Sequence, residues 1–249
     1  MGLLLMKSLS FSEYLHMAER VFFELQFEAT PGQLKSLALY VERLIIGLKK
    51  VRLTGESTAE ELFNKQIYDS LYPIKIIPFK KGGKILDLGS GGGLPGIPLS
   101  IVLPENEIVL LDSNKKKTTY IAETVNRLSL KNVQVINGRA EEYGHLEGHR
   151  GSYDYVVSKA VAEMNVLAEY TLPFLKVQGD TMLYKGPRGE QELLAAAGAI
   201  KICGGEYLQS HHYKLPGGEE RVLYIIRKTD ITPDKYPRRI GVPNKNPIK

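Results

Sequence analysis

Apolar residues in the first part of the chain recur at helical spacing. In residues 9–26 they follow an i, i+3, i+4, i+7 stripe, which is typical of an amphipathic helix with one buried face. Thr30 and Pro31 then mark a helix start, as the N-cap and the first helical residue. We therefore expect helices over residues 9–26, 31–47 and 59–72.

From Lys84 onward the pattern changes to short apolar runs that alternate with longer amphipathic stretches. The runs predict strands, and the stretches between them predict helices. The expected strands are residues 85–88, 107–111, 133–136, 153–157, 181–184, 206–215 and 221–228. The expected helices of this part are residues 97–103, 116–128, 164–175 and 190–199.

Strand–helix alternation indicates an α/β fold, because right-handed crossovers build a parallel sheet with helices on both faces. The last two runs are joined by Pro216, Gly217 and Gly218 and form a hairpin, so the last strand should be antiparallel. We divide the chain into a helical N-terminal extension (residues 1–80), a Rossmann-like core (81–228) and a basic, Pro-rich tail (229–249). The tail should be extended and without regular structure.

Composition narrows the class of protein. The 249 residues are 43% hydrophobic and 24% charged, which is typical of a globular protein that buries a core. The single Cys203 excludes a disulfide framework and a multi-cysteine zinc site. Residues 1–6 are apolar but too few for a signal peptide, and no run is long enough to span a membrane. We expect a cytoplasmic monomer that binds neither a membrane nor a metal ion.

The charge of the chain lies mainly at its end. Net charge is +5, and the excess of basic residues lies between Arg227 and Lys249. A basic tail attracts phosphate backbones without reading base sequence. It can equally serve to keep an end segment solvated, and charge alone does not decide between the two.

A glycine-rich turn, residues 87–96, joins the first strand of the core to the helix that follows. Glycines at such a turn let backbone N–H groups approach a ligand, because no Cβ stands in the way. The spacing Gly91-x-Gly93-x-x-Gly96 also satisfies the dinucleotide-binding fingerprint. The turn is therefore compatible with two cofactors, a nicotinamide dinucleotide (NAD) and S-adenosylmethionine (SAM).

Acidic residues at the ends of three expected strands bear on that choice. Ligands of an open α/β sheet bind outside the carboxyl ends of the strands, where Asp87, Asp112 and Glu141 lie. Asp112 suits the ribose hydroxyls of either cofactor, and Glu141 suits the amino group of adenine. Asp87 favours SAM, because SAM carries an ammonium and a sulfonium, whereas a pyrophosphate would be repelled. Each acid taken singly also has a structural explanation, such as a helix start.

Five stretches carry a family resemblance. They are Asp87-Leu-Gly-Ser-Gly-Gly-Gly-Leu-Pro-Gly-Ile-Pro-Leu, Leu111-Asp-Ser-Asn-Lys-Lys-Lys, Gly138-Arg-Ala-Glu-Glu, Ser158-Lys-Ala-Val-Ala and Tyr184-Lys-Gly-Pro-Arg. Together with the basic tail, they resemble the RsmG (glucose-inhibited division protein B) family of bacterial 16S rRNA guanine-N7 methyltransferases. The resemblance implies a class I SAM-dependent methyltransferase fold that acts on 16S rRNA of the small ribosomal subunit and releases S-adenosylhomocysteine.

The resemblance also implies site residues, because that family's cofactor contacts map onto Gly89, Leu94, Ala140, Glu141 and Lys159. With the neighbouring acids and turn residues, the predicted cofactor site comprises Asp87, Gly89, Gly91, Leu94, Asp112, Ser113, Ala140, Glu141 and Lys159. This chain departs from the family where Lys159 replaces the usual Arg, where Arg52-Leu53-Thr54 replaces the usual Asn-Leu-Thr, and where Lys65-Gln66 replaces the usual Arg-His pair.

Methylation of guanine N7 needs no general base, since N7 already presents a lone pair. The catalytic candidates are therefore cations: Lys159 and Lys185 could donate to guanine O6 or to phosphate. Phosphate contacts with RNA are predicted for Arg188, Arg238 and Arg239. Two alternatives remain, an NAD-dependent oxidoreductase and a ribosome-binding relative that has lost activity.

Overall fold

The computed structural model describes residues 9–48 and 51–249. In this part of the chain the strands form one seven-stranded sheet in the order β3-β2-β1-β4-β5-β7-β6. The strands are β1 (Lys84–Leu88), β2 (Glu107–Asp112), β3 (Val133–Asn137), β4 (Tyr153–Lys159), β5 (Leu175–Lys185), β6 (Gly205–Lys214) and β7 (Glu220–Lys228). The first five pair in parallel, whereas β7 is antiparallel to β5 and β6. The predicted sheet is confirmed.

The N-terminal helices begin within two residues of their predicted starts. The first two are α1 (Phe11–Leu25) and α2 (Pro31–Leu48). The third begins after Thr58, whose hydroxyl accepts from the backbone N–H of Glu61 at 3.2 Å. It is not uniform, because its four segments are α3 (Ala59–Glu61), a π-helical segment (Leu62–Ile67), α4 (Tyr68–Leu71) and a 3₁₀ turn (Tyr72–Lys75). The predicted opening run, residues 1–6, lies outside the described residues.

Four helices of the core follow the predicted alternation: α5 (Gly96–Val102), α6 (Lys115–Arg127), α8 (Met164–Thr171) and α9 (Gly189–Ile202). The short α7 (Ala140–Tyr143) lies where no helix was predicted. One expectation was wrong: α8 does not run to residue 175. It gives way to a 3₁₀ turn (Leu172–Phe174), because Pro173 has no N–H to continue the helix, and β5 then begins at Leu175, which pairs with Tyr153.

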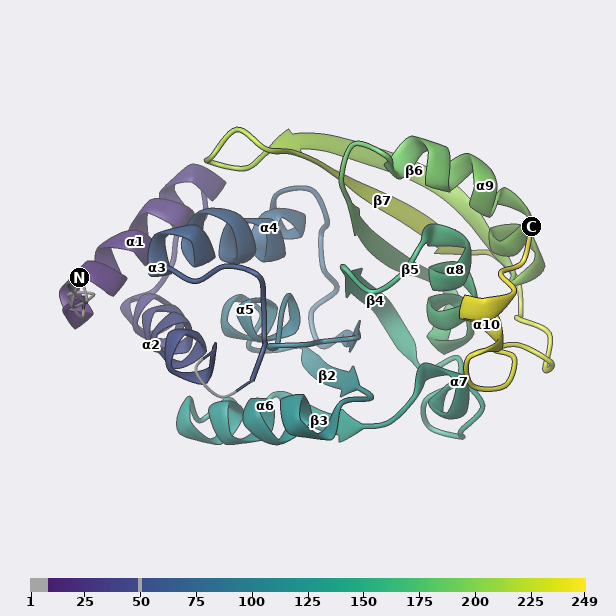
Figure 1. Cartoon of the computed structure of the whole chain (residues 1–249), viewed down its shortest axis with the longest axis horizontal. Helices are drawn as coiled ribbons and strands as arrows, with labels where there is room; N and C mark the ends of the chain where they lie inside the picture. The colour runs from purple at the N-terminus through teal and green to yellow at the C-terminus, as the bar shows by residue number, and fades with distance from the viewer. Residues whose placement is uncertain (1–8, 49–50) are drawn as a thin grey trace, which may run out of the picture.

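Helices cover both faces of the sheet, as Figure 1 shows. One apolar core lies between the sheet and α1, α2, α5 and α6, and it includes Leu37, Leu44 and Ile121. The other lies between the sheet and α8 and α9, and it includes Leu167 and Ala199. The chain leaves β1 towards β2 and β3 and then returns on the other side as β4, so the direction of the sheet order reverses between β1 and β4. A ligand crevice is expected at the carboxyl ends of these strands.

The tail differs from its prediction in one respect. It is largely irregular, but it contains a helical turn, α10 (Val242–Lys245), which lies beside α7 and α8 in Figure 1. Pro243 in the first turn permits this, because the N–H groups there have no helical partner in any case. Among the described residues, no helix is both long and apolar enough to cross a membrane.

Candidate functional site

A cleft opens at the carboxyl edge of the sheet. Its walls come from the ends of β1, β2 and β4, the start of α6, the β3–α7 turn, α8 and α10. The predicted cofactor residues that line it are Gly89, Asp112, Ser113, Ala140 and Glu141. The other four, Asp87, Gly91, Leu94 and Lys159, do not line it. The residues on the wall that sequence reasoning missed include Lys117, Arg139, Val161, Tyr170 and Asn244.

The glycines of the turn are required for different structural reasons. Gly89, Gly91 and Gly93 have φ values of 78°, 57° and 95°, which favour glycine. Gly89 faces Val161 of the cleft wall, and an added Cβ there would clash with that side chain. A Cβ at Gly93 would instead collide with Ile97 in the core, and one at Gly96 would collide with Leu110 and Asp87. The later glycines of the dinucleotide fingerprint are therefore explained by packing.

Asp112, at the end of β2, stabilises the glycine turn through a hydrogen bond to its backbone. Its Oδ2 accepts from the backbone N–H of Gly91 at 2.8 Å, and its Oδ1 accepts from that of Asn114 at 2.8 Å. Each carboxylate oxygen has a second lone pair, so Asp112 can still accept from hydroxyl groups in the cleft. One side chain thus both shapes the glycine turn and presents acceptors to a ligand.

Asp87 lies beneath the turn and is fully buried. Its Oδ2 accepts from the backbone N–H of Gly96 at 2.7 Å, whereas its Oδ1 is buried with no hydrogen-bond partner among the described residues. Burial raises the pKa of this carboxyl to about 7, against the opposing effects of the Gly96 hydrogen bond and the Lys159 ammonium. The described residues thus leave one buried acceptor of Asp87 unsatisfied beneath the turn.

We predict that the buried carboxyl of Asp87 makes the folded protein less stable as pH rises. Its pKa rises from 3.8 to about 7 on folding, so the native state binds the proton more tightly than the unfolded chain does. The associated stability is complete below pH 3.8 and is lost as pH rises to about 7, a span on the order of 4 kcal/mol. Asp87→Asn keeps the acceptor for Gly96 but cannot ionise. Urea unfolding at several pH values measures the free energy of unfolding of both proteins. Between pH 4 and 7 the stability of the variant should increase relative to that of the parent. A difference in stability that does not change with pH would contradict the raised pKa of Asp87.

Lys159 lies at the end of β4 inside a polar cluster that includes the third N-terminal helix. Its ammonium donates to Gln66 Oε1 at 2.8 Å and to Ser70 Oγ at 3.1 Å, and it lies 3.6 Å from Asp69 Oδ2. Burial lowers the pKa of Lys159, while the carboxylates of Asp69, Asp87 and Glu56 oppose that shift. Lys159 and Gln66, which both depart from the family pattern, are thus direct partners, and Gln66 lies in the π-helical segment.

The other predicted catalytic lysine is held away from solvent. Lys185 donates to Glu192 Oε2 and to the carbonyl of Ala162, both at 2.6 Å. These contacts connect the end of β5 to α9 and to the loop after β4. A ligand could engage Lys185 only in competition with Glu192.

The three predicted RNA contacts differ in their surroundings. Arg188, the N-cap of α9, and Arg239 in the tail are both exposed. Arg238 is engaged in a bidentate ion pair with Glu169, whose side chain is only 1% exposed. The guanidinium of Arg238 therefore has a structural partner that the charge of the tail does not indicate.

The side chain of Glu141, on the cleft wall, forms hydrogen bonds with α8 and with the C-terminal tail. Its Oε1 accepts from the hydroxyl of Tyr170 at 3.1 Å and from the backbone N–H of Gly241 at 3.0 Å. Asn244 of α10 in turn donates to the Tyr170 oxygen at 3.1 Å. Tyr170 and Asn244 carry no sequence signal, since each becomes part of the site only through the packing of α8 and the tail.

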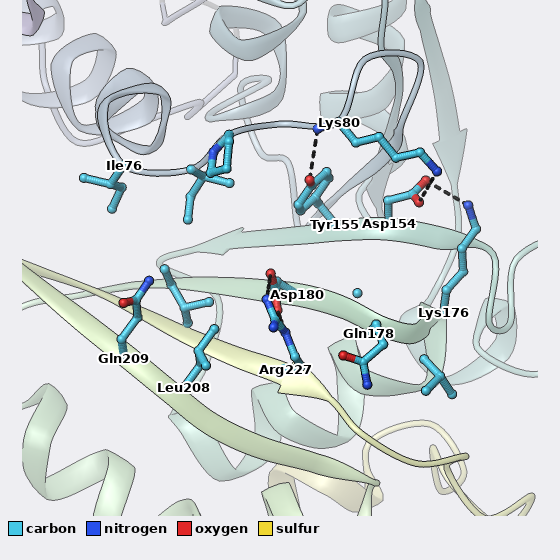
Figure 2. A pocket seen from close by; sticks show the side chains of 15 residues that line it. Ile76, Lys80, Asp154, Tyr155, Lys176, Gln178, Asp180, Leu208, Gln209 and Arg227 are labelled. Atoms are coloured by element: carbon cyan, nitrogen blue, oxygen red, sulfur yellow. Dashed lines mark hydrogen bonds and ion pairs between the residues drawn. The ribbon is translucent and has the colours of Figure 1, made fainter.

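A second cleft lies at the opposite edge, where β4 and β5 begin (Figure 2). Its cations are already paired: Lys176 and Lys80 with Asp154, and Arg227 in a bidentate pair with Asp180. It lies away from the glycine turn and does not include any of the predicted site residues. Across residues 9–48 and 51–249, no group of three or more His, Cys, Asp or Glu side chains is placed to hold a metal ion.

Comparisons with known proteins agree on one kind of protein. A family model described as rRNA small subunit methyltransferase G matches residues 33–223. The ribosomal RNA small subunit methyltransferase G of Lactococcus lactis is 37% identical over 91% of this chain and 95% of its own length. That of Alkaliphilus metalliredigens is 40% identical, with the same coverage of both chains.

Solved structures support the fold. TYW2 of M. jannaschii, in complex with AdoMet, matches with a TM-score of 0.53 at 17% identity, covering 73% of this chain and 80% of that one. The fibrillarin pre-rRNA processing protein of Methanococcus jannaschii matches with a TM-score of 0.51 at 15% identity, covering 67% and 76%. At these identities the likeness concerns the Rossmann-like methyltransferase fold alone.

Proposed function

Because the chain belongs to the rRNA small subunit methyltransferase G family, we propose that it transfers the methyl group of SAM to N7 of a guanine in 16S rRNA. The chain is a SAM-dependent rRNA methyltransferase; the choice of guanine N7 is the proposed part. The observation that carries the proposal is the convergence of Gly89, Asp112 and Glu141 on one cleft where the sheet order reverses.

The residues of the cleft fit SAM. Asp112 offers acceptors for ribose hydroxyls, and Glu141 offers one for the adenine amino group. Gly89 lines the cleft with no Cβ, because Val161 occupies the space that a Cβ would take, and the orphaned Oδ1 of Asp87 is buried beneath the same turn. When bound, SAM supplies an electrophilic methyl group on a sulfonium, and a buried carboxylate nearby suits that positive charge.

The protein's own contribution to the reaction is alignment. The lone pair of guanine N7 attacks the methyl carbon directly, the bond between that carbon and sulfur breaks, and S-adenosylhomocysteine is the leaving group; no proton has to leave first. A general base is therefore unnecessary, and correct placement of two reactants can alone be worth an effective molarity on the order of 10⁵ M or more. Lys159 and Lys185, bound within the protein, act in this scheme by fixing the loop after β4, which forms one wall of the cleft.

The RNA partner is 16S rRNA of the small subunit. An active site at the bottom of a cleft reaches only a base that is exposed or splayed out of the helix. The exposed Arg188 and Arg239 are the proposed phosphate contacts, whereas Arg238 contributes through its pair with Glu169.

The oxidoreductase alternative loses its basis. It depended on the fingerprint Gly91-x-Gly93-x-x-Gly96, and Gly93 and Gly96 face core side chains where a pyrophosphate could not approach. The family match is to methyltransferases over most of the chain. A relative without activity is an outcome that the methyl-transfer assay decides.

Calorimetry tests the cofactor. SAM and S-adenosylhomocysteine should each bind one site per chain, whereas NAD should give no binding heat at the same concentration. Binding of NAD with none of SAM would overturn the proposed function. Binding of SAM without methyl incorporation into under-methylated small subunits would support the inactive relative instead.

A further inference from the structure

The C-terminal tail lies against the cofactor cleft. After β7 it runs beside α8 and α7, forms α10 next to them, and then continues to the C-terminus beside α9, coloured yellow in Figure 1. Asn244 of α10 lines the cleft beside Tyr170 and Glu141. The segment that charge alone marks as an RNA-binding tail therefore forms part of the wall of the cofactor site.

Two arginines fix this segment. Arg238 donates to both carboxylate oxygens of Glu169, at 2.7 to 3.1 Å, and Glu169 is buried on α8. Arg150 donates to the backbone carbonyls of Thr232 at 2.6 Å and Tyr236 at 2.9 Å. Pairs with a buried carboxylate and with several carbonyls are charge-assisted and geometrically specific. The position of α10 is thus set by contacts on the sheet side of the tail.

The hydrogen bonds at the end of the tail have a definite direction. The Glu141 carboxylate can only accept, so Tyr170 must donate its single hydroxyl proton to Oε1. The Tyr170 oxygen is then free to accept, and Asn244 donates to it from Nδ2 at 3.1 Å. The backbone N–H of Gly241 gives Oε1 a second donor. Gly241, the N-cap of α10, therefore acts on this carboxylate oxygen directly, and Asn244 acts on it through Tyr170.

This leaves the other oxygen of Glu141 for a ligand. No hydrogen bond within the described residues uses Oε2, and Glu141 lines the cleft although it is only 6% exposed. We propose that the tail, through Gly241 and Asn244, locks the Glu141 carboxylate so that Oε2 accepts from the 6-amino group of adenine. The inference rests on the proposed function, since it assigns the adenine end of the SAM site.

A lock of this kind should control which base is accepted. A fixed carboxylate attracts the 6-amino group of adenine and repels the 6-oxo group of hypoxanthine. A loosened carboxylate can turn away and tolerate either base. Asn244 is then a positioning residue, and its effect should appear in the preference between the two bases.

The test compares S-adenosylhomocysteine with S-inosylhomocysteine by calorimetry on the full chain. Asn244→Ala removes the donor to Tyr170, and Tyr170→Phe removes the relay itself. Each should weaken S-adenosylhomocysteine binding about three- to tenfold, the effect of one hydrogen bond, and lower the adenine preference by a similar factor. The double variant should be no worse than the single ones, because both act on one path. Asn246→Ala, an exposed asparagine of the same tail, should match the parent.

The outcomes separate the two proposals. An unchanged preference in Asn244→Ala, or an equal loss of affinity for both ligands, would overturn the inference while leaving the proposed function standing. Failure of the parent chain to bind S-adenosylhomocysteine at all would overturn the proposed function and the inference with it. A reduced preference shared by the two variants and absent from Asn246→Ala supports the inference.

Discussion

Lys159→Met should lower the free energy of unfolding by about 3–5 kcal/mol, the cost of breaking a buried ion pair by removing one partner. The ammonium faces Asp69, which is 5% exposed, and offsets the charge of Asp87, which is fully buried. Without it, Asp69 has no ion-pair partner among the described residues, and Gln66 and Ser70 lose the donor that joins β4 to the third N-terminal helix. Urea denaturation at pH 7.5 measures the loss.

Lys176→Met is the matched control. Lys176 also pairs with an aspartate, at 2.8 Å from Asp154 Oδ2, but its side chain is 45% exposed at the opposite edge of the sheet. Exposed pairs contribute about 0–1 kcal/mol, so the control should change stability little. Equal effects of the two substitutions would contradict the structural role given to Lys159.

Asp112→Ala should weaken SAM binding about 100-fold or more. The substitution removes the proposed acceptor of ribose hydroxyls and frees the Gly91 N–H that shapes the turn, and a hydrogen bond to a charged group is worth about 1.5–3 kcal/mol. Calorimetry with SAM measures the change. A loss smaller than about threefold would remove Asp112 from the cofactor site.

Asp154→Ala controls for the loss of a strand carboxylate. Asp154 lies in β4 and accepts from the backbone N–H of Lys84 at 2.9 Å, much as Asp112 accepts from Gly91. It lies at the opposite edge of the sheet, so SAM affinity should match that of the parent. Weakening by both variants alike would point to general destabilisation.

The edge of the sheet that holds the site could be predicted from sequence because strand ends are local features. Asp87, Asp112 and Glu141 each follow or end a short apolar run, and parallel strands bring such ends to one edge. The division of labour among them could not be predicted. Asp87 proved to lie beneath the turn, since its orientation depends on how α5 packs over β1.

The remaining features of the site could not be predicted, because they depend on contacts between residues far apart in the sequence. The contact between Lys159 and Gln66 joins residues 93 positions apart, and the sequence shows only that each departs from a family pattern. The sequence predicts a basic, irregular tail, because a net charge calculated from the sequence does not show that Arg238 has an ion-pair partner. Its partner Glu169 is on α8, 69 positions away, and no local pattern marks that pair.

The identity of the methylated nucleoside tests the central claim most directly. Small ribosomal subunits that lack the modification would be incubated with the protein and methyl-labelled SAM, and their 16S rRNA digested to nucleosides for mass spectrometry. We predict that the label appears in 7-methylguanosine and that Asp112→Ala strongly reduces it. No incorporation by the parent protein, or a label confined to another nucleoside, would contradict the proposed reaction.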